Sequence, residues 1–292
     1  MVIGFILLVI VNLLLKNLIK INLATRKIAS GNYKETVLVK GTNELSELAE
    51  NMNTMAKAID ENTTKITKLA ENRKMFIANL AHEMKTPLTS ILGFADLLKV
   101  KRFVTDEQRL EYASIITDET KRLRSLSSKL MELITTQNAI PQFNSVDISL
   151  LIKDTSKTLQ PILKSKNITL VCYTQKLVAE IDEELFKSLL INLIDNAIKA
   201  SSENSEILIK MKDNKISITD YGIGMEQSEI DKIFEPFYMV DKSRSKKSGG
   251  TGLGLALCVE IAKLHQVALS FESKPLIGTT ATITFKGGLQ DE

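Results

Sequence analysis

The chain has 292 residues, of which 44% are hydrophobic and 25% charged, which excludes a disordered polypeptide and is enough for two packed domains. The formal net charge is only +3, and no basic block is interleaved with aromatic residues, so we expect no nucleic-acid partner. The two cysteines, Cys172 and Cys258, lie far apart and outside any metal-binding spacing, which excludes a disulfide framework.

The N-terminal segment is uncharged. Residues 1 to 15 read MVIGFILLVIVNLLL, and Lys16 and Lys20 follow. Fifteen helical residues span about 22 Å against a hydrocarbon core of about 30 Å, so we extend the segment to residue 20 with its lysines reaching the interface. A signal peptide is the alternative, but neither a basic leader nor a small-residue cleavage site is present. We predict a membrane anchor over residues 1 to 20, with the following residues in the cytoplasm.

A second helical pattern follows a break at Gly31-Asn32 and begins near Thr42 or Asn43. From Leu45 to Leu69, apolar residues recur in alternating steps of three and four with only Asn62 breaking the row, which predicts a coiled-coil seam. The order of helix, connector and helix after an apolar segment resembles a HAMP module. This resemblance implies a coiled-coil relay over residues 16 to 70.

The apolar stripe continues beyond Arg73 but is shifted by one residue, running from Ile77 to Leu98. A slip near residues 70 to 77 requires local overwinding or underwinding of the seam. Two interpretations stay open: a point where a signal switches between two packings, and ordinary phase drift in a long helix.

A further helix is predicted from Asp106 to about Ile134, after a turn around residues 102 to 105. Two long helices with apolar stripes form a hairpin that cannot bury both stripes by itself. We therefore predict that the hairpin dimerises into a four-helix bundle and that the protein is a homodimer.

His82 lies on the polar side of the first hairpin helix. It is two residues from Leu80, about 200° around the helix, so it points away from the apolar stripe. Glu83 is adjacent and Thr86 lies one turn further along the same face. A carboxylate beside an imidazole can accept its Nδ1 proton and leave Nε2 as a nucleophile. An idle surface histidine is the alternative interpretation.

The segment LAHEMKTPLTSILGF around His82 resembles the H-box of bacterial sensor histidine kinases. The resemblance implies a dimerisation and histidine phosphotransfer domain over residues 71 to 138. In it, His82 would accept the phosphoryl group and Glu83 would be its activating acid. Thr86 would position a hydrolytic water during dephosphorylation of the partner, or would be a simple surface threonine.

After Pro141 the pattern changes to short β-branched runs alternating with helices, which favours an α/β sandwich. We predict helices at about 150 to 165, 183 to 201 and 252 to 265, and expect His265 to be structural. The predicted strands are NITLVCY (167 to 173), LVAEI (177 to 181), EILIKM (206 to 211), KISITD (215 to 220) and ATITF (281 to 285).

Three polar clusters accompany this half. Asn192, Asn196 and Lys199 form one line on an otherwise aliphatic helix, where amide oxygens suit a hydrated hard cation and lysine suits phosphate. Asp220 ends a strand before Gly222 and Gly224, so its carboxylate can accept from an exocyclic amine beside a flat ring. SGGTGLGLAL, residues 248 to 257, is a glycine loop entering a helix, which favours phosphate.

In this order, with FEPF (residues 234 to 237) between the second and third, the clusters resemble the N, G1, F and G2 boxes of the ATP-binding domain shared by histidine kinases, gyrase-type ATPases and Hsp90. The resemblance implies a Bergerat (GHKL) sandwich over residues 144 to 288, a lid over residues 238 to 250, and ATP and Mg²⁺ as cofactors. Asn196 and Asn192 would serve the metal. The implied ATP-binding residues are Asn192, Asn196, Lys199, Asp220, Gly222, Gly224, Phe234, Gly250, Thr251, Gly252, Leu253, Gly254, Leu255 and Thr280.

Together with the predicted anchor, these resemblances imply a multidomain sensor histidine kinase of the bacterial cell membrane with its catalytic domains in the cytoplasm. It would autophosphorylate His82 from ATP and pass the phosphoryl group to an aspartate of a cognate response regulator. A GHKL-type ATPase is one alternative, although it has no use for the H-box. A non-catalytic signalling scaffold is another, although it has no need of Asp220 and Asn196.

Overall fold

The computed structural model describes residues 1–37, 44–100, 104–241 and 250–285, with the side chains at positions 9, 10, 13, 14 and 17 outside the description. The chain divides into two compact units, Met1–Ala78 and Asn79–Glu292. Much of the predicted lid, the start of the helix near Thr42 and the first part of the hairpin turn lie outside the described residues.

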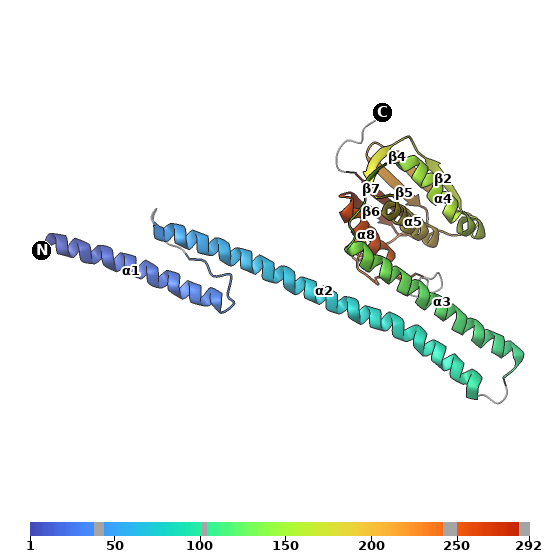
Figure 1. Cartoon of the computed structure of the whole chain (residues 1–292), viewed down its shortest axis with the longest axis horizontal. Coiled ribbons are helices and arrows are strands. Elements are labelled where there is room, and N and C mark those ends of the chain that lie inside the picture. The colour runs from blue at the N-terminus through green and yellow to red at the C-terminus, as the bar shows by residue number, and fades with distance from the viewer. Residues whose placement is uncertain (38–43, 101–103, 242–249, 286–292) are drawn as a thin grey trace. The chain divides into compact units, whose positions relative to one another are not determined.

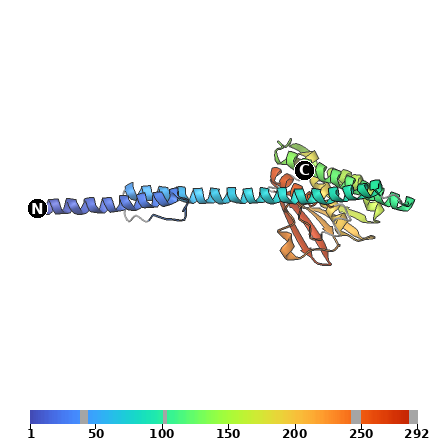
Figure 2. The ribbon, with the colours of Figure 1, turned by 90° about the horizontal axis from the view of Figure 1, so that it is seen from below.

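The first unit is built from helix α1 (Val2–Ala29) and the beginning of helix α2 (Glu44–Val100). The two helices lie side by side in Figures 1 and 2. The predicted break is confirmed, because α1 ends before Gly31, whose φ is +98°. The two helices and the connector share an apolar cluster made of Ile21, Ala24, Ile28, Val37, Ala49, Met52 and Ala56.

The connector is tied to α2 by Asn53. Its Oδ1 accepts from Val37 N at 2.8 Å and its Nδ2 donates to Val37 O at 3.0 Å. Both backbone groups of Val37 are thereby paired while its side chain enters the apolar cluster. In the part of the chain that the structure describes, no helix is long and apolar enough to cross a membrane, and the anchor stays a prediction.

The second unit contains the predicted hairpin. Helix α2 continues through Pro87 as one element to Val100, and helix α3 spans Asp106–Gln137. Thr105 caps α3 by accepting from Gln108 N at 3.2 Å, which satisfies one of the unpaired N–H groups of the first turn. The predicted second helix is therefore confirmed and extends three residues further than the pattern indicated.

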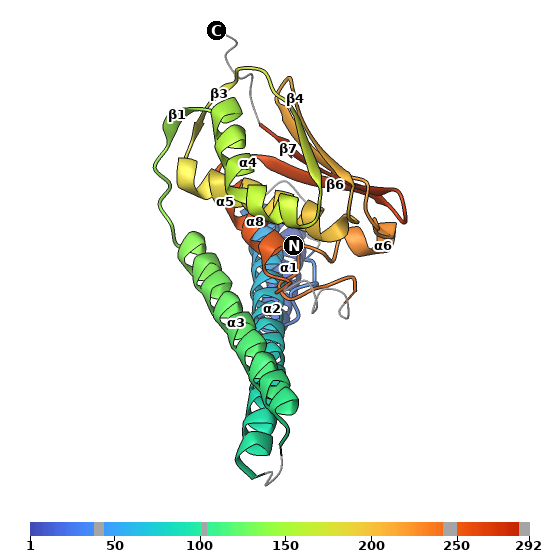
Figure 3. The same cartoon turned by 90° about the vertical axis from the view of Figure 1, so that its right-hand side faces the viewer.

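The rest of the second unit is a two-layer sandwich. A five-stranded sheet has the order β2-β4-β5-β7-β6, where β2 and β4 are parallel and the other pairs antiparallel. Figure 3 shows α4, α5 and α8 on one face of this sheet. The strands of this sheet are β2 (Thr169–Tyr173), β4 (Glu206–Lys212), β5 (Lys215–Asp220), β6 (Ala268–Lys274) and β7 (Gly278–Thr284). The helices are α4 (Ile148–Ser165), α5 (Glu183–Ala200), α6 (Gln227–Ile230) and α8 (Gly254–Leu264).

The structure adds elements that the sequence pattern did not indicate. Strand β1 (Asn144–Asp147) pairs with β3 (Val178–Ile181) in a separate two-stranded sheet. Strand β6 lies at the sheet edge and its residues alternate between exposed and half-buried. Both additional strands are poor in β-branched residues, so they lack the signal on which the other strands were predicted.

The predicted structural role of His265 agrees with its contacts. Its Nε2 accepts from Asp182 N at 3.0 Å, and Nδ1 lies 2.8 Å from Ile261 O. The rings of Phe143 and Phe186 meet its imidazole edge to face, with centroids 5.6 and 5.5 Å away. His265 therefore joins the end of α8 to the start of α5 by packing and hydrogen bonds.

Candidate functional site

His82 is exposed on α2, as its helical angle predicts. Beside it is a cavity of about 160 Å³. Asn79, His82 and Glu83 line one side, and residues 235–239, which follow α6 in the same unit, line the other. The imidazole therefore faces a defined space that is walled by its own chain.

Glu83 is held by the second hairpin helix. Its Oε2 accepts from Arg122 Nη2 at 3.0 Å, and each side chain is 15% exposed. Glu119 lies 3.9 Å from the same guanidinium. Thr86 donates its hydroxyl to the backbone oxygen of His82 at 3.3 Å. Thus Arg122 takes one oxygen of the predicted activating acid, and among the described residues no hydrogen bond engages the other oxygen.

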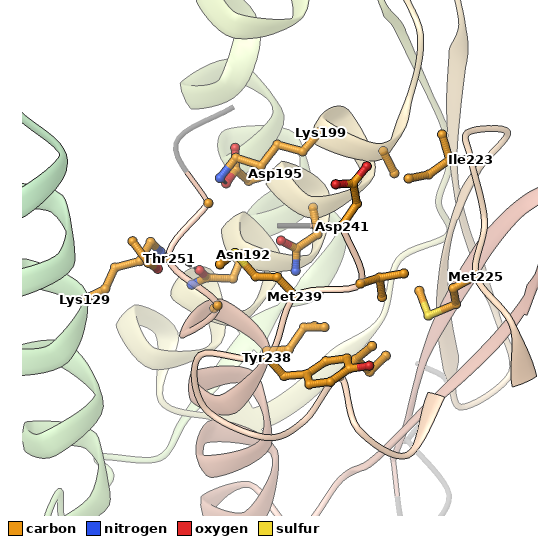
Figure 4. Close-up of a pocket in the computed structure, with 18 residues that line it drawn as sticks. Lys129, Asn192, Asp195, Lys199, Ile223, Met225, Tyr238, Met239, Asp241 and Thr251 are labelled. Carbon is orange, nitrogen blue, oxygen red and sulfur yellow. Dashed lines mark hydrogen bonds and ion pairs between the residues drawn. The ribbon is translucent and has the colours of Figure 1, made fainter. Parts of the chain in front are cut away.

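A second cavity, of about 210 Å³, lies between α5 and the glycine loop that precedes α8. Figure 4 shows its lining. The structure brings together eight predicted ATP-binding residues here: Asn192, Asn196, Lys199, Gly250, Thr251, Gly252, Gly254 and Leu255. Because α8 begins at Gly254, the N-terminal end of that helix, with its unpaired N–H groups, opens into the cavity.

The polar line of α5 is partly engaged. Asn192, only 5% exposed, accepts at Oδ1 from Lys129 Nζ of α3 at 2.7 Å. Lys199 pairs with Asp195 one turn away at 2.7 Å. Figure 4 shows Lys129 reaching from α3 into this group. A hairpin residue therefore belongs to the lining of the cavity.

The glycine loop is fastened to the segment 235–239. Phe237 N donates to Gly252 O at 2.8 Å, and Phe237 has a φ of +69°. Gly252 has a φ of +68°, and a Cβ added there would lie 2.7 Å from two backbone atoms of Phe237. Leu253 is fully buried, which anchors the loop below the cavity. Glycine is required at position 252 by both conformation and space.

Asp220 and its glycines lie beside a third cavity, of about 390 Å³, whose lining includes Asp220, Thr279 and Thr280. The Asp220 carboxylate accepts from Gly222 N at 2.9 Å. Burial raises the pKa of Asp220, and the hydrogen bonds from Gly222 N and Thr279 N partly oppose this shift. The Thr280 hydroxyl pairs with that of Thr219 at 3.0 Å.

The glycines of the Asp220 loop allow close backbone contacts. A Cβ at Gly222 would lie 2.3 Å from Ala200 O, and one at Gly224 would lie 1.9 Å from Lys274 O. Neither glycine lines the 210 Å³ cavity, but Ile223 and Met225 between and after them do. Phe234 packs against Phe271 with ring centroids 5.5 Å apart. The 210 Å³ cavity is therefore not lined by six of the predicted ATP-binding residues, namely Asp220, Gly222, Gly224, Phe234, Leu253 and Thr280; of these, Asp220 and Thr280 line the third cavity.

Sequence reasoning missed several lining residues. Asp195 is the immediate neighbour of Asn196, so extending that motif by one position would have found it. Tyr238 and Met239 fall within the predicted lid of residues 238 to 250, which gave them no role of their own. Lys129 carries no local signal, because only the fold brings α3 to α5. The other missed lining residues are Ala200, Ile223, Met225 and Ile233, while Val240 and Asp241 fall within the predicted lid.

Asp195, Asn196 and Asp241 line the cavity, and carboxylate and amide oxygens are ligands that a hydrated Mg²⁺ accepts. The Asp195 carboxylate also pairs with Lys199 at 2.7 Å. Asn192 fits the metal less well in this arrangement, because its oxygen accepts from the Lys129 ammonium. Within the described ranges, no cluster of three or more His, Cys, Asp or Glu side chains offers a metal site.

Three family profiles match the chain in succession. They are the HAMP domain over residues 9–61, the His Kinase A (phospho-acceptor) domain over residues 72–138, and the histidine kinase-, DNA gyrase B- and HSP90-like ATPase over residues 181–288. The last two cover the hairpin with His82 and most of the sandwich with the cavity.

Named relatives agree with these profiles. Histidine protein kinase SaeS of Staphylococcus aureus is 30% identical over 290 residues, which cover 94% of this chain and 82% of SaeS. Sensor histidine kinase YkoH of Bacillus subtilis is 31% identical over 256 residues, which cover 86% of this chain and 55% of YkoH. The chain thus spans about half the length of YkoH.

A solved structure supports the same assignment. The chain resembles histidine kinase ThkA, crystallised in complex with response regulator protein TrrA, with a TM-score of 0.61 and 26% identity. The match covers 78% of this chain and 65% of that one. Its hairpin and ATPase-type sandwich, its three family profiles and its likeness to SaeS show that the chain belongs to the sensor histidine kinases.

Proposed function

We propose that the protein autophosphorylates His82 from Mg-ATP and then passes the phosphoryl group to an aspartate of a response regulator. The observation that carries the proposal is the occurrence, in one compact unit, of an exposed H-box histidine beside a cavity and of a glycine loop opening into a second, polar cavity. Residues 71–138 would present the histidine, and residues 144–288 would bind the nucleotide.

In this proposal the phosphates lie at the glycine loop. The backbone N–H groups at the start of α8 and the Lys199 ammonium would neutralise their charge. Asn196, with carboxylate oxygens nearby, would hold Mg²⁺, which neutralises phosphate charge. Asp220 would accept from the exocyclic amine of the base, with Gly222 and Gly224 admitting the ring. The remaining predicted residues shape the walls around these groups.

The transfer step is a displacement at phosphorus. The lone pair of His82 Nε2 attacks the γ-phosphorus, the bond between that atom and its bridging oxygen breaks, and the electron pair leaves with ADP. The Nδ1 proton passes to Glu83, whose second oxygen remains after Arg122 has taken the first. Because little covalent chemistry is required of the protein, alignment and charge neutralisation provide the acceleration.

A second copy of the chain and a response regulator complete the proposal. Hairpin side chains such as Leu92 (63% exposed) and Leu110 (72% exposed) are apolar and uncovered, which favours burial in a homodimer. The regulator is proposed because ThkA was crystallised with TrrA.

Thr86 would position a water for dephosphorylation of the regulator, unless it serves only as a helix-surface residue. The cell membrane is proposed through the predicted anchor of residues 1 to 20.

Incubation with γ-labelled ATP tests the proposal. We expect acid-labile label on the wild type, none on His82→Gln, and retained label on His265→Gln, which changes the other histidine. Asn196→Asp should also abolish the label. ATP hydrolysis without labelled protein would replace the kinase by an ATPase, and absence of nucleotide binding would leave the signalling scaffold.

A further inference from the structure

The segment 235–239 belongs to two cavities at once. Tyr238 and Met239 line both the nucleotide cavity and the cavity beside His82. The same segment is joined to the glycine loop by the hydrogen bond from Phe237 N to Gly252 O. A single short piece of backbone therefore separates the predicted phosphate site from the predicted acceptor, and both cavities belong to the same chain.

Residues 235–239 form a wall common to the two cavities, and Tyr238 in this wall is hydrogen-bonded to the nucleotide-binding half. Its hydroxyl donates to Glu229 of α6, whose carboxylate also pairs with Lys232. The hydrogen bond from Tyr238 lowers the pKa of Glu229 and in turn raises the pKa of Tyr238, so the acceptor is the anion and the donor stays protonated. Tyr238 is thus bonded to its own sandwich while it lines the cavity beside His82.

Two polar contacts fasten the sandwich to its own hairpin. Lys129 Nζ donates to Asn192 Oδ1 at 2.7 Å, and one turn along both helices Ser188 donates to Glu132. Asn192 is nearly fully buried, so this lysine contact is shielded from solvent. Charge-assisted hydrogen bonds with restricted solvent access are stronger than exposed ion pairs.

The connection between the two parts is short. Six residues, 138–143, join the end of α3 at Gln137 to the start of β1 at Asn144. Fully extended, they would span about 20 to 25 Å. Part of this length is already committed, because Gln142 N donates to Asp182 of the sandwich at 2.9 Å. The sandwich therefore has little freedom to leave its own hairpin.

From these four observations we infer that each chain phosphorylates its own His82, that is, in cis within the proposed dimer. The segment 235–239 is common to the cavity that holds the donor and the cavity beside the acceptor. The inference rests on the proposed kinase function, and the bonds made and broken are those given above. A partner's histidine would be reached only after Lys129 and Glu132 had released the sandwich.

Heterodimers with two different affinity tags test this inference. One heterodimer pairs a His82→Gln chain with an Asn196→Asp chain, so that the intact histidine and the intact nucleotide site are on different chains. The other pairs a wild-type chain with a chain carrying both substitutions. Phosphorylation in cis predicts less than about a tenth of wild-type labelling per intact His82 in the first heterodimer and full labelling of the wild-type chain in the second.

The opposite pattern, with label on the Asn196→Asp chain of the first heterodimer, would overturn the inference. Gly252→Ala in place of Asn196→Asp provides a second nucleotide-site lesion once isothermal titration shows that the variant does not bind Mg-ATP, and circular dichroism confirms that each variant is folded. If the protein proves monomeric, labelling per chain that is independent of protein concentration supports the inference, and labelling that rises with concentration refutes it. Absence of label on the wild-type homodimer would refute the proposed function itself and is distinguishable from both patterns.

Discussion

Replacement of Gly252 by alanine tests the geometry of the glycine loop. The new Cβ would lie 2.7 Å from both the Cα and the carbonyl carbon of Phe237, which real Cβ atoms do not show. These are backbone atoms, and the hydrogen bond from Phe237 N to Gly252 O keeps them in place. The φ of +68° at this position is also unfavourable for alanine.

The free-energy cost of Gly252→Ala is the sum of the backbone strain and the steric overlap. Left-handed backbone costs a residue with a Cβ about 1–2 kcal/mol, and forced overlap in a packed region costs about 1–3 kcal/mol. Together they amount to roughly 2–5 kcal/mol. If the loop moves away from Phe237, the loss appears in Mg-ATP affinity, where 2 kcal/mol is about 30-fold in Kd. If the loop stays, the free energy of unfolding falls instead.

Isothermal titration with Mg-ATP and denaturant unfolding, performed on the same preparation, measure both losses. Gly93→Ala is the matched control, because a Cβ at that helical glycine meets nothing within 4 Å. This control should be neutral, or more stable by up to about 1 kcal/mol. A Gly252→Ala protein with wild-type affinity and wild-type stability would refute the packing derived for the glycine loop.

Three further expectations follow from polar groups that are buried or half-buried. Burial raises the pKa of Asp220 in the folded protein above its pKa in the unfolded chain. As the pH rises from the unfolded-state pKa through the folded-state pKa, the wild type should therefore lose free energy of unfolding relative to Asp220→Asn, with no further loss at higher pH. Parallel plots of the free energy of unfolding against pH for the two proteins would contradict this. His265→Leu leaves Asp182 N without its acceptor and should cost about 1–3 kcal/mol in thermal unfolding, whereas His265→Gln should lose less; equal losses would argue for ring packing alone. Burial raises the pKa of Cys258 to about 12, so alkylation of the native protein followed by mass spectrometry should modify the exposed Cys172 first, and equal rates would contradict the buried environment.

The contrast between two helical residues shows how far local pattern reaches. The angle between His82 and Leu80 on a regular helix predicted an exposed imidazole, and the structure has it exposed. Lys129 offers no such cue, because it is one of several polar residues on α3 and its significance depends on Asn192, 63 residues later. Periodicity encodes which side of a helix is apolar, but not which other element will meet the polar side.

The strands illustrate the same limit at the level of the fold. β5 was predicted because β-branched residues alternate along it, and its bounds agree with the predicted ones. β6 reads ALSFESK and has weak intrinsic preference, so it forms because β7 offers a register of hydrogen bonds along its whole length. Strand β6 is therefore stabilised by pairing with β7 rather than by its own residues, and a short window of sequence around β6 does not show this pairing.

By itself, the sequence determined the hairpin, the helices of the sandwich, the position of His82 and the resemblance of the nucleotide motifs, because each depends on residues a few positions apart. Only the tertiary structure decided that Arg122 holds Glu83, that Lys129 enters the nucleotide cavity, and that residues 235–239 form a wall common to both cavities. These contacts join residues from 39 to more than 150 positions apart, as between Glu83 and Arg122 or His82 and Tyr238. They form because whole helices and strands pack together. The free energy of this packing is shared among many residues, so no single motif predicts these contacts.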